Sequence, residues 1–561
     1  MVALFTPRRL ALATILLALL AAPFTALATE CLTPQLPRPA ASPDAIRAAL
    51  QAQGLWQRTG DPALTPPADP QVGDTWMWYV WDLGGFPVAN LKPATVRGLG
   101  DHCYVVVDDE EWNVSMDQDD VDTIVAHFDD MSVGQFADQG IWDLDTSHFG
   151  DPPNSLDGLD RIFLFYYRFD ISADGFFWIY DQFPDGSQAF ASNECEVVYL
   201  ATDNGEPAGD YMMAVAAHEF THLIMHASDS NEESWMEEGL GELAMWLFGR
   251  PDTISGFNSN PDNSLIDWGS QWADYIQTYL WTLYCYERFG GQEFIWDLAH
   301  EPANGLTGYQ NVLDQELERV TTAEIFDDWS VANYLDDTSV PDGRYGYVGE
   351  NLPLFVPWRT WTTYPVSDLG TIRSYGTDYV RLRDLTEAPT ISFDGSDGAV
   401  WAVSLMALDP IQPTLVQSMT LDNAGAGSML FDAAAGYQEV VMSVADVSAT
   451  SNGIYTYEVS LGVTSTEVPA VVAAVRAAPN PFNPRTELSF DLAVAGHARL
   501  SIHRPDGSLV STLVDGDLAA GPQRLSWQGR DAAGHPMPSG TYLVRLETAD
   551  GVSSTKAMLV R

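Results

Sequence analysis

The segment His218-Glu219-Phe220-Thr221-His222 decides how the N-terminal half of this chain should fold and what it could bind. Apolar residues surround it from Ala214 to Met225, with no Gly or Pro, so the pattern predicts a buried helix. Residues four apart share one face of a helix, so His218 and His222 can aim two imidazole nitrogens at one metal ion. A catalytic zinc site needs a third protein ligand and a water, with Glu219 beside them as general base.

A second segment, Trp235-Met236-Glu237-Glu238-Gly239-Leu240-Gly241-Glu242, contains the candidates for the third ligand. Glu238 and Glu242 lie one helical turn apart, and the residues alone allow either to reach the metal. His226 extends the series of histidines, but it lies about 12 Å along the helix axis from His218, too far to share one ion. We therefore interpret His226 as a second-turn or surface residue.

Together the two segments resemble the gluzincin metallopeptidases, closest to the secreted hyicolysin-like and immune-inhibitor-A-like bacterial proteases. The resemblance covers roughly residues 75 to 345. It implies that Glu238 is the third Zn²⁺ ligand and that Glu242 orients a ligand histidine. Tyr275, at the start of a Tyr-rich segment, is our candidate for supporting the oxyanion. Core packing is the alternative role for Tyr275.

The activity that this resemblance implies is zinc-dependent endopeptidase activity, in which a metal-activated water hydrolyses peptide bonds. A zinc aminopeptidase is an alternative, because the segment from Trp235 to Gly239 also resembles that clan, although a Gly-x-Met-Glu-Asn motif for binding the amine is missing. A surface-binding or adhesion protein with an inactive protease fold is another alternative. The intact Glu219 and the full ligand set argue against it.

A loop between Gly150 and Arg161 suggests Ca²⁺ as a second cofactor. It gathers Asp151, Asp157 and Asp160 around turn residues, and hard oxygen ligands of this kind suit calcium. The spacing differs from that of an EF-hand, and in so acidic a chain a solvated loop is the alternative.

The N-terminus predicts a secreted or surface-attached protein. Arg8-Arg9 precede an apolar run from Leu10 to Ala22 and the small residues Ala26-Leu27-Ala28, which is typical of a signal peptide over residues 1–28. The run is too short for a permanent membrane span. Since no other long apolar stretch follows, we expect no transmembrane segment in the mature chain.

Four cysteines follow the predicted signal peptide, too few for a scaffold built on disulfides. The count is compatible with one or two bridges, and Cys103 and Cys195, on strands that we expect to be neighbours, are the pair to test first. None of the four has the spacing of a structural zinc site, and no Cys/His/Asn signature indicates a cysteine nucleophile.

The charge of the chain limits its partners. The formal net charge is −52, and only two lysines occur, Lys92 and Lys556. Binding of nucleic acid through a basic face is therefore excluded, and the expected partners are protein or peptide substrates. Hydrophobic residues make up 46% of the chain and aromatic residues 11%, which excludes disorder for most of its length.

A chain of 561 residues is too long for one core, so we expect several domains. Residues 29–72 are rich in Pro and Ala and are interpreted as a leader or pro-segment. Residues 73–360 are the predicted α+β zinc metallopeptidase domain. In residues 361–463, alternating segments separated by Asp, Gly and Asn turns predict an all-β sandwich.

The last segment follows a predicted linker over residues 464–478. Ala478-Pro479-Asn480-Pro481-Phe482-Asn483-Pro484 leads into short strands up to the C-terminus. Residues 479–561 resemble the Ig-like tail domain of the flagellar-hook-capping type, which also serves as a sorting signal for the type-nine (Por) secretion route. The resemblance implies an Ig-like β-sandwich that contacts secretion or cell-surface machinery; a plain structural Ig-like module is the alternative.

Overall fold

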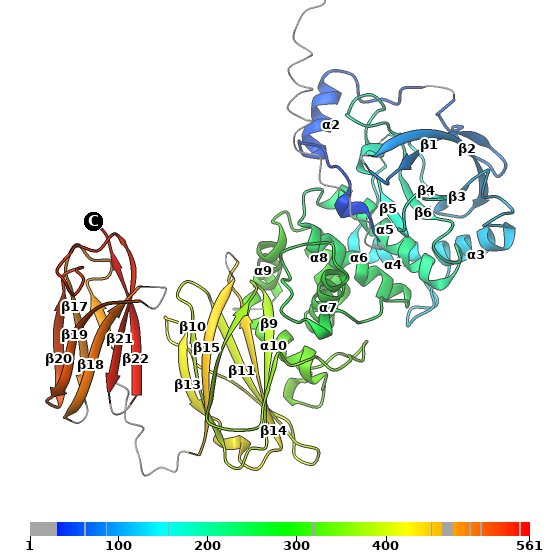
Figure 1. The fold of residues 1–561 in the computed structure, drawn as a ribbon. Coiled ribbons are helices and arrows are strands. Elements are labelled where there is room, and N and C mark those ends of the chain that lie inside the picture. The colour runs from blue at the N-terminus through cyan, green and yellow to red at the C-terminus, as the bar shows by residue number, and fades with distance from the viewer. Residues whose placement is uncertain are drawn as a thin grey trace, which may run out of the picture. The chain divides into compact units, whose positions relative to one another are not determined.

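The computed structural model describes the chain from Cys31 to Arg561 (Figure 1). Within this range it leaves out residues 61–62, 86, 155, 317–319, 450–451, 463–474, 493–494, 505–507 and 549–550. The predicted signal peptide and most of the predicted linker therefore lie outside the described residues. The chain forms two compact units, which meet in the sequence at Leu461 and Gly462.

The first unit begins with a six-stranded mixed sheet in the order β1-β2-β3-β4-β6-β5. Its strands are β1 (Thr75–Asp82), β2 (Val88–Leu99), β3 (Cys103–Asp108), β4 (Ile162–Tyr167), β5 (Gly175–Phe177) and β6 (Val197–Ala201). β3, β4 and β6 run parallel, while β1, β2 and β5 are antiparallel to their neighbours. Every residue of the three parallel strands is buried, as expected for strands that are covered on both faces.

Side chains of β3 alternate between two hydrophobic cores, one on each face of the sheet. Cys103 and Val105 belong to the core that the helices form, whereas Tyr104 and Val106 belong to an aromatic-rich core on the other face. Successive side chains of a strand point to opposite faces, so this strand anchors both cores.

Cys103 and Cys195, the pair to test first for a disulfide, are not bridged, because all four cysteines are free. β4 lies between β3 and β6, so the two cysteines are not on neighbouring strands. Cys103 also faces the helical core, while Cys195 lies in the core on the opposite face of the sheet.

Most of the α-helices pack in the core on the face of this sheet that contains Cys103 and Val105. The α-helices are α2 (Pro43–Ala52), α3 (Gln118–Asp129), α4 (Ile141–Phe149), α5 (Asp210–Ser228), α6 (Ser234–Phe248), α7 (Trp272–Arg288), α8 (Gln292–Ala299), α9 (Gly305–Glu316) and α10 (Thr322–Leu335), and the 3-10 helices are η1 (Thr33–Gln35), η2 (Ile179–Gln182), η3 (Phe257–Ser259), η4 (Pro341–Gly343) and η5 (Asp432–Ala434). α5 is buried at every residue from Met212 to His226, as the apolar flanks predict. None of the helices in the described part of the chain is both long and apolar enough to cross a membrane.

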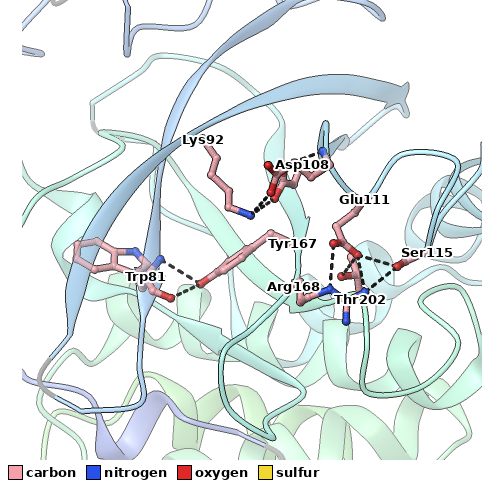
Figure 2. Close-up of polar contacts among 9 residues, drawn as sticks. Trp81, Lys92, Asp108, Glu111, Ser115, Tyr167, Arg168 and Thr202 are labelled. Carbon is pink, nitrogen blue, oxygen red and sulfur yellow. Dashed lines mark hydrogen bonds and ion pairs between the residues drawn. The ribbon is translucent and has the colours of Figure 1, made fainter.

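A polar network ties together the carboxyl ends of the parallel strands (Figure 2). Glu111, just after β3, accepts hydrogen bonds from Ser115 at 2.7 Å and from Thr202, just after β6, at 2.9 Å. Arg168, just after β4, donates to both oxygens of Glu111 at 3.1 and 3.2 Å. Because charged hydrogen bonds of this kind are strong, the network fixes the strand ends that precede the helices.

A β-sandwich completes the first unit. Its sheets have the orders β13-β10-β15-β8 and β12-β11-β14-β9-β7. The strands are β7 (Arg359–Trp361), β8 (Val366–Ile372), β9 (Gly376–Arg383), β10 (Pro389–Gly395), β11 (Trp401–Leu408), β12 (Leu415–Ser418), β13 (Ala426–Leu430), β14 (Glu439–Asp446) and β15 (Gly453–Leu461). On β14, Val440 and Val444 face the sandwich core, and Val441 and Ala445 face the helical core. The sandwich and the helices therefore share packing through this strand.

The second unit is a smaller β-sandwich of two sheets, in the orders β16-β17-β20 and β19-β18-β21-β22. Its strands are β16 (Arg476–Ala478), β17 (Thr486–Leu492), β18 (Gly496–His503), β19 (Leu509–Leu518), β20 (Gly521–Trp527), β21 (Gly540–Thr548) and β22 (Gly551–Leu559). Phe482, Trp527 and Tyr542 pack against one another in its core, with ring centroids 5.3 and 5.0 Å apart. The two sheets form the Ig-like arrangement that the sequence predicts for this end of the chain.

Candidate metal centre

α5 and α6 bring the two predicted segments together in the interior of the first unit. His218 Nε2 lies 3.3 Å from Glu238 Oε2, and His222 Nε2 lies 3.2 Å from Glu238 Oε1. The three side chains are at most 3% exposed. One carboxylate thus faces both imidazoles, in a place that water does not reach.

These separations fit a zinc ion. Zinc with bonds of ~2.0–2.1 Å in a tetrahedron places neighbouring donor atoms about 3.3–3.4 Å apart. His218 Nε2 and Glu238 Oε2 are buried and make no hydrogen bond with any residue that the structure describes. A shared cation would satisfy both atoms, which otherwise are costly to bury.

A fourth donor belongs to the same group and was not predicted from the sequence. Cys31 Sγ lies 3.4 Å from His222 Nε2 and 3.9 Å from Glu238 Oε1. Among the described residues, four donor atoms lie within 4.8 Å of one another, and they belong to Cys31, His218, His222 and Glu238. Nothing in the sequence around Cys31 marks it as a ligand, because its partners are far away along the chain.

Electrostatics favour a charged carboxylate at Glu238. Burial alone would raise the pKa of Glu238, but the neighbouring imidazoles of His222 and His218 outweigh it and hold the pKa at about 2. Metal ligation needs a deprotonated carboxylate and neutral imidazoles. Glu238 is in that state, whereas His218, whose pKa burial would lower but Cys31, Glu238 and Glu242 raise, has to release its proton when a metal binds.

Glu242 lies behind the donor group. Its Oε1 is 3.5 Å from His218 Nδ1, the ring nitrogen that faces away from Glu238. Burial, together with the charge of Asp252, raises the pKa of Glu242 to about 8. The structure therefore places Glu238 with the histidine Nε2 atoms and Glu242 where it can orient His218.

Two glycines of α6 allow the helices to approach this closely. A Cβ at Gly241 would lie 2.8 Å from the His218 imidazole, and a Cβ at Gly239 would lie 2.6 Å from the Thr278 hydroxyl on α7. Isolated glycines inside an apolar helix indicate close packing, so this approach could have been predicted from the sequence.

The predicted general base and oxyanion donor both face the centre. Glu219 is fully buried, and burial raises its pKa. Its Oε2 accepts a hydrogen bond from Thr33 Oγ1 at 3.0 Å. Tyr275, also buried, donates a hydrogen bond from its hydroxyl to the carbonyl oxygen of Cys31 at 3.1 Å.

His226 is buried, so its interpretation as a surface residue is wrong. It does lie outside the donor group, as expected from its distance along the helix from His218. It packs against Phe177 and Phe183, with ring centroids 5.7 and 6.3 Å apart. Burial, with the charges of Arg47 and Arg38, lowers the pKa of His226 to about 3, so the imidazole is neutral.

The predicted calcium residues lie between α4 and β4. Asp157 Oδ1 accepts a hydrogen bond from Leu159 N at 2.9 Å, and burial raises the pKa of Asp157. Among the described residues, Asp151, Asp157 and Asp160 do not form a metal-ligating group like that around Glu238. Calcium in this loop stays a prediction.

The family match found for this chain lies in the second unit. Residues 480–551 match the FlgD Ig-like domain family, and no curated protein matches the chain. Similar solved structures include FlgD from P. aeruginosa (23% identity, 16% of this chain and 67% of that chain, TM-score 0.12). PorZ, described as an essential bacterial surface component of the type-IX secretion system of Porphyromonas gingivalis, matches at 14% identity (28% and 22%, TM-score 0.13).

A third similar structure is dimeric latent PorU from Porphyromonas gingivalis, at 15% identity over 37% of this chain and 19% of that chain, with a TM-score of 0.16. At these TM-scores, similarity over the whole chain carries no argument about its fold. The family match lies outside the residues of the metal centre. The chain carries a C-terminal FlgD Ig-like domain.

Proposed function

We propose that this chain is a secreted zinc-dependent endopeptidase in which His218, His222 and Glu238 hold the metal. The observation that carries the proposal is the spacing of their donor atoms, 3.2 and 3.3 Å between carboxylate and imidazoles. This spacing suits zinc, and the donors stand on two buried helices, which hold a site more precisely than loops do.

The residues around the donors have the properties that peptide hydrolysis requires. Zinc bound there would lower the pKa of a water molecule to about 7. Glu219 is the proposed group that accepts the proton of this water and returns it to the leaving amine. Tyr275 is the proposed donor to the oxyanion, because its hydroxyl already donates to a carbonyl oxygen beside the donor group.

The edge of the sheet favours an endopeptidase over an aminopeptidase. β5 is an edge strand, and a Cβ at its Gly175 would lie 2.8 Å from Glu219 Cγ. Gly175 O accepts a hydrogen bond from Leu32 N at 3.2 Å. We therefore propose that this edge binds a substrate as an extended peptide through main-chain groups, as it binds Leu32, without requiring a free amino terminus.

Two further features support the proposal. An inactive binding protein would not need Glu219. Burying this ionisable side chain beside three metal donors costs folding free energy, so its presence there indicates a function. The FlgD Ig-like domain supports export or attachment to the cell surface. Its partner would be the secretion or surface machinery.

The test compares the parent with Glu219→Gln, each after proteolytic removal of the N-terminal residues up to Ser42, which precedes α2. Zinc is measured per chain, and casein hydrolysis is followed with and without a chelator. We expect one zinc per chain in both proteins, and chelator-sensitive hydrolysis in the parent alone. Hydrolysis by Glu219→Gln within about tenfold of the parent would overturn the mechanism, because loss of a general base costs ~10²–10⁴-fold.

A further inference from the structure

The N-terminal segment from Cys31 to Arg38, the Cys31 segment, lies in the place where a substrate would have to bind. Cys31 forms an isolated parallel bridge with Gly175 on the edge strand β5. Its neighbours Leu32 and Leu36 are buried in the aromatic-rich core of the sheet. In Figure 1 this dark-blue segment runs beside β5.

The Cys31 thiol lies close enough to the other donors, 3.4 Å from His222 Nε2 and 3.9 Å from Glu238 Oε1, to take the fourth position of the proposed zinc site. A Zn–S bond of ~2.3 Å beside a Zn–N bond of ~2.0–2.1 Å gives a separation of about 3.5 Å between sulfur and nitrogen. The observed separation between Cys31 Sγ and His222 Nε2 is 3.4 Å, and Cys31 is 1% exposed. A catalytic zinc keeps one position open for water, whereas four protein donors describe a closed site.

The Cys31 segment also occupies the other groups that the reaction needs. Thr33 Oγ1 donates to Glu219 Oε2 at 3.0 Å and accepts from Phe177 N at 2.8 Å. Tyr275 donates to the carbonyl oxygen of Cys31. The general base, the oxyanion donor and the edge strand are therefore all engaged by one short stretch of chain.

An ion pair fastens the far end of the segment. Arg38 pairs with Glu237, the residue before the ligand Glu238, and its Nη1 lies 3.5 Å from Glu237 Oε1. Beyond it, Ala40, Ala41 and Ser42 are exposed. A protease can reach the chain at these three residues, immediately after the part that fills the site.

We propose that the Cys31 thiolate is a fourth protein ligand of the zinc and that the Cys31 segment keeps the enzyme latent until it is removed. The latency rests on the proposed peptidase function, whereas the ligation of zinc by Cys31 does not. Cleavage at residues 40–42 releases the segment, which opens the fourth position to water and frees Glu219 from Thr33.

The test of ligation uses the full chain loaded with Co²⁺ in place of zinc. The parent should show a near-ultraviolet thiolate-to-Co²⁺ charge-transfer absorption. Cys31→Ser should lose this absorption while keeping one metal per chain, since three ligands remain. Cys285→Ser is the matched control, because Cys285 is equally buried on α7 but lies outside the donor group. Absence of the absorption in the metal-loaded parent would overturn the proposal, even if a variant failed to fold.

The test of latency replaces residues 40–42 with the recognition sequence of a specific protease. Before cleavage the full chain should be nearly inactive on casein. After cleavage its activity should rise at least about tenfold, because activity follows the fraction of chains with an open site. Equal activity before and after cleavage would overturn the latency while leaving the peptidase in place. If the parent shows the thiolate-to-Co²⁺ absorption but the cleaved form has no activity, the ligation by Cys31 is supported and the proposed peptidase function is rejected.

Discussion

Gly241 on α6 lies directly against His218 on α5, so closely that a Cβ at Gly241 would be 2.8–2.9 Å from three atoms of the imidazole ring. The ring cannot move away without leaving the donor group, because its Nε2 faces Glu238 at 3.3 Å and its Nδ1 faces Glu242 at 3.5 Å. The glycine thus sets the distance between the two ligand helices.

Gly241→Ala should therefore disturb the metal site more than the fold. We expect the zinc affinity of Gly241→Ala to fall by at least about tenfold, similar to the loss of a group that orients a ligand. Zinc per chain after dialysis at a fixed free-zinc concentration is the measurement. Gly85→Ala is the control, since a Cβ there meets nothing within 4 Å. Full zinc affinity in Gly241→Ala would contradict the packing argument.

Glu238 and Glu242 should differ sharply on removal. Glu238→Ala loses the carboxylate that faces both histidines and should bind almost no zinc. Glu242→Ala keeps all three donors and should lose only about 10–100-fold in affinity or activity. Zinc stoichiometry of both variants decides this, and a metal-free Glu242→Ala beside a loaded Glu238→Ala would reverse the two roles.

The sequence predicts the parts of this site that depend on local geometry. His218 and His222 share a face because helical spacing places residues i and i+4 together. The sandwich strands follow from alternation, and the FlgD Ig-like domain from its own sequence pattern. These features are encoded within a few residues of one another.

The parts that depend on distant contacts were not predictable. Cys31 lies 191 positions from His222 in the sequence, and no local pattern links the two residues. The order of the strands is a second example, because the insertion of β4 between β3 and β6 separates Cys103 from Cys195. Strand order is decided by packing of the whole unit, which a pattern of residues along one strand does not contain.

The Glu111 network of Figure 2 should contribute to the stability of the first unit. Glu111→Ala removes the acceptor for Ser115, Thr202 and Arg168 and leaves the buried Thr202 hydroxyl without this bond. We expect the free energy of unfolding to fall by about 1.5–3 kcal/mol, the range for hydrogen bonds to charged groups. Chemical denaturation measures it, with the exposed neighbour Glu110→Ala as control. If Glu111→Ala and Glu110→Ala lower the free energy of unfolding by the same amount, the Glu111 network does not contribute to stability.

Asp378 should make the first unit less stable as the pH rises. Its Oδ2 accepts a hydrogen bond from the Tyr455 hydroxyl at 2.8 Å, between the two sheets of the sandwich. Burial raises the pKa of Asp378 to about 7, whereas the unfolded chain has a value of about 3.9. Between these values the folded state binds more protons than the unfolded state, so the contribution of Asp378 is fully present below about pH 4 and is lost as the pH rises through 7.

Asp378→Asn resembles the protonated acid at every pH, so it should match the parent at pH 4 and become more stable than the parent as the pH rises to 8. The difference should grow by at most about 1.4 kcal/mol per pH unit. Chemical denaturation of the parent and of Asp378→Asn at each pH measures it, with Glu458→Gln, at an exposed position on the same sandwich, as the control. A difference between Asp378→Asn and the parent that stays constant from pH 4 to pH 8 would mean that Asp378 is ionised in the folded protein, and that Tyr455 together with nearby solvent stabilises its charge.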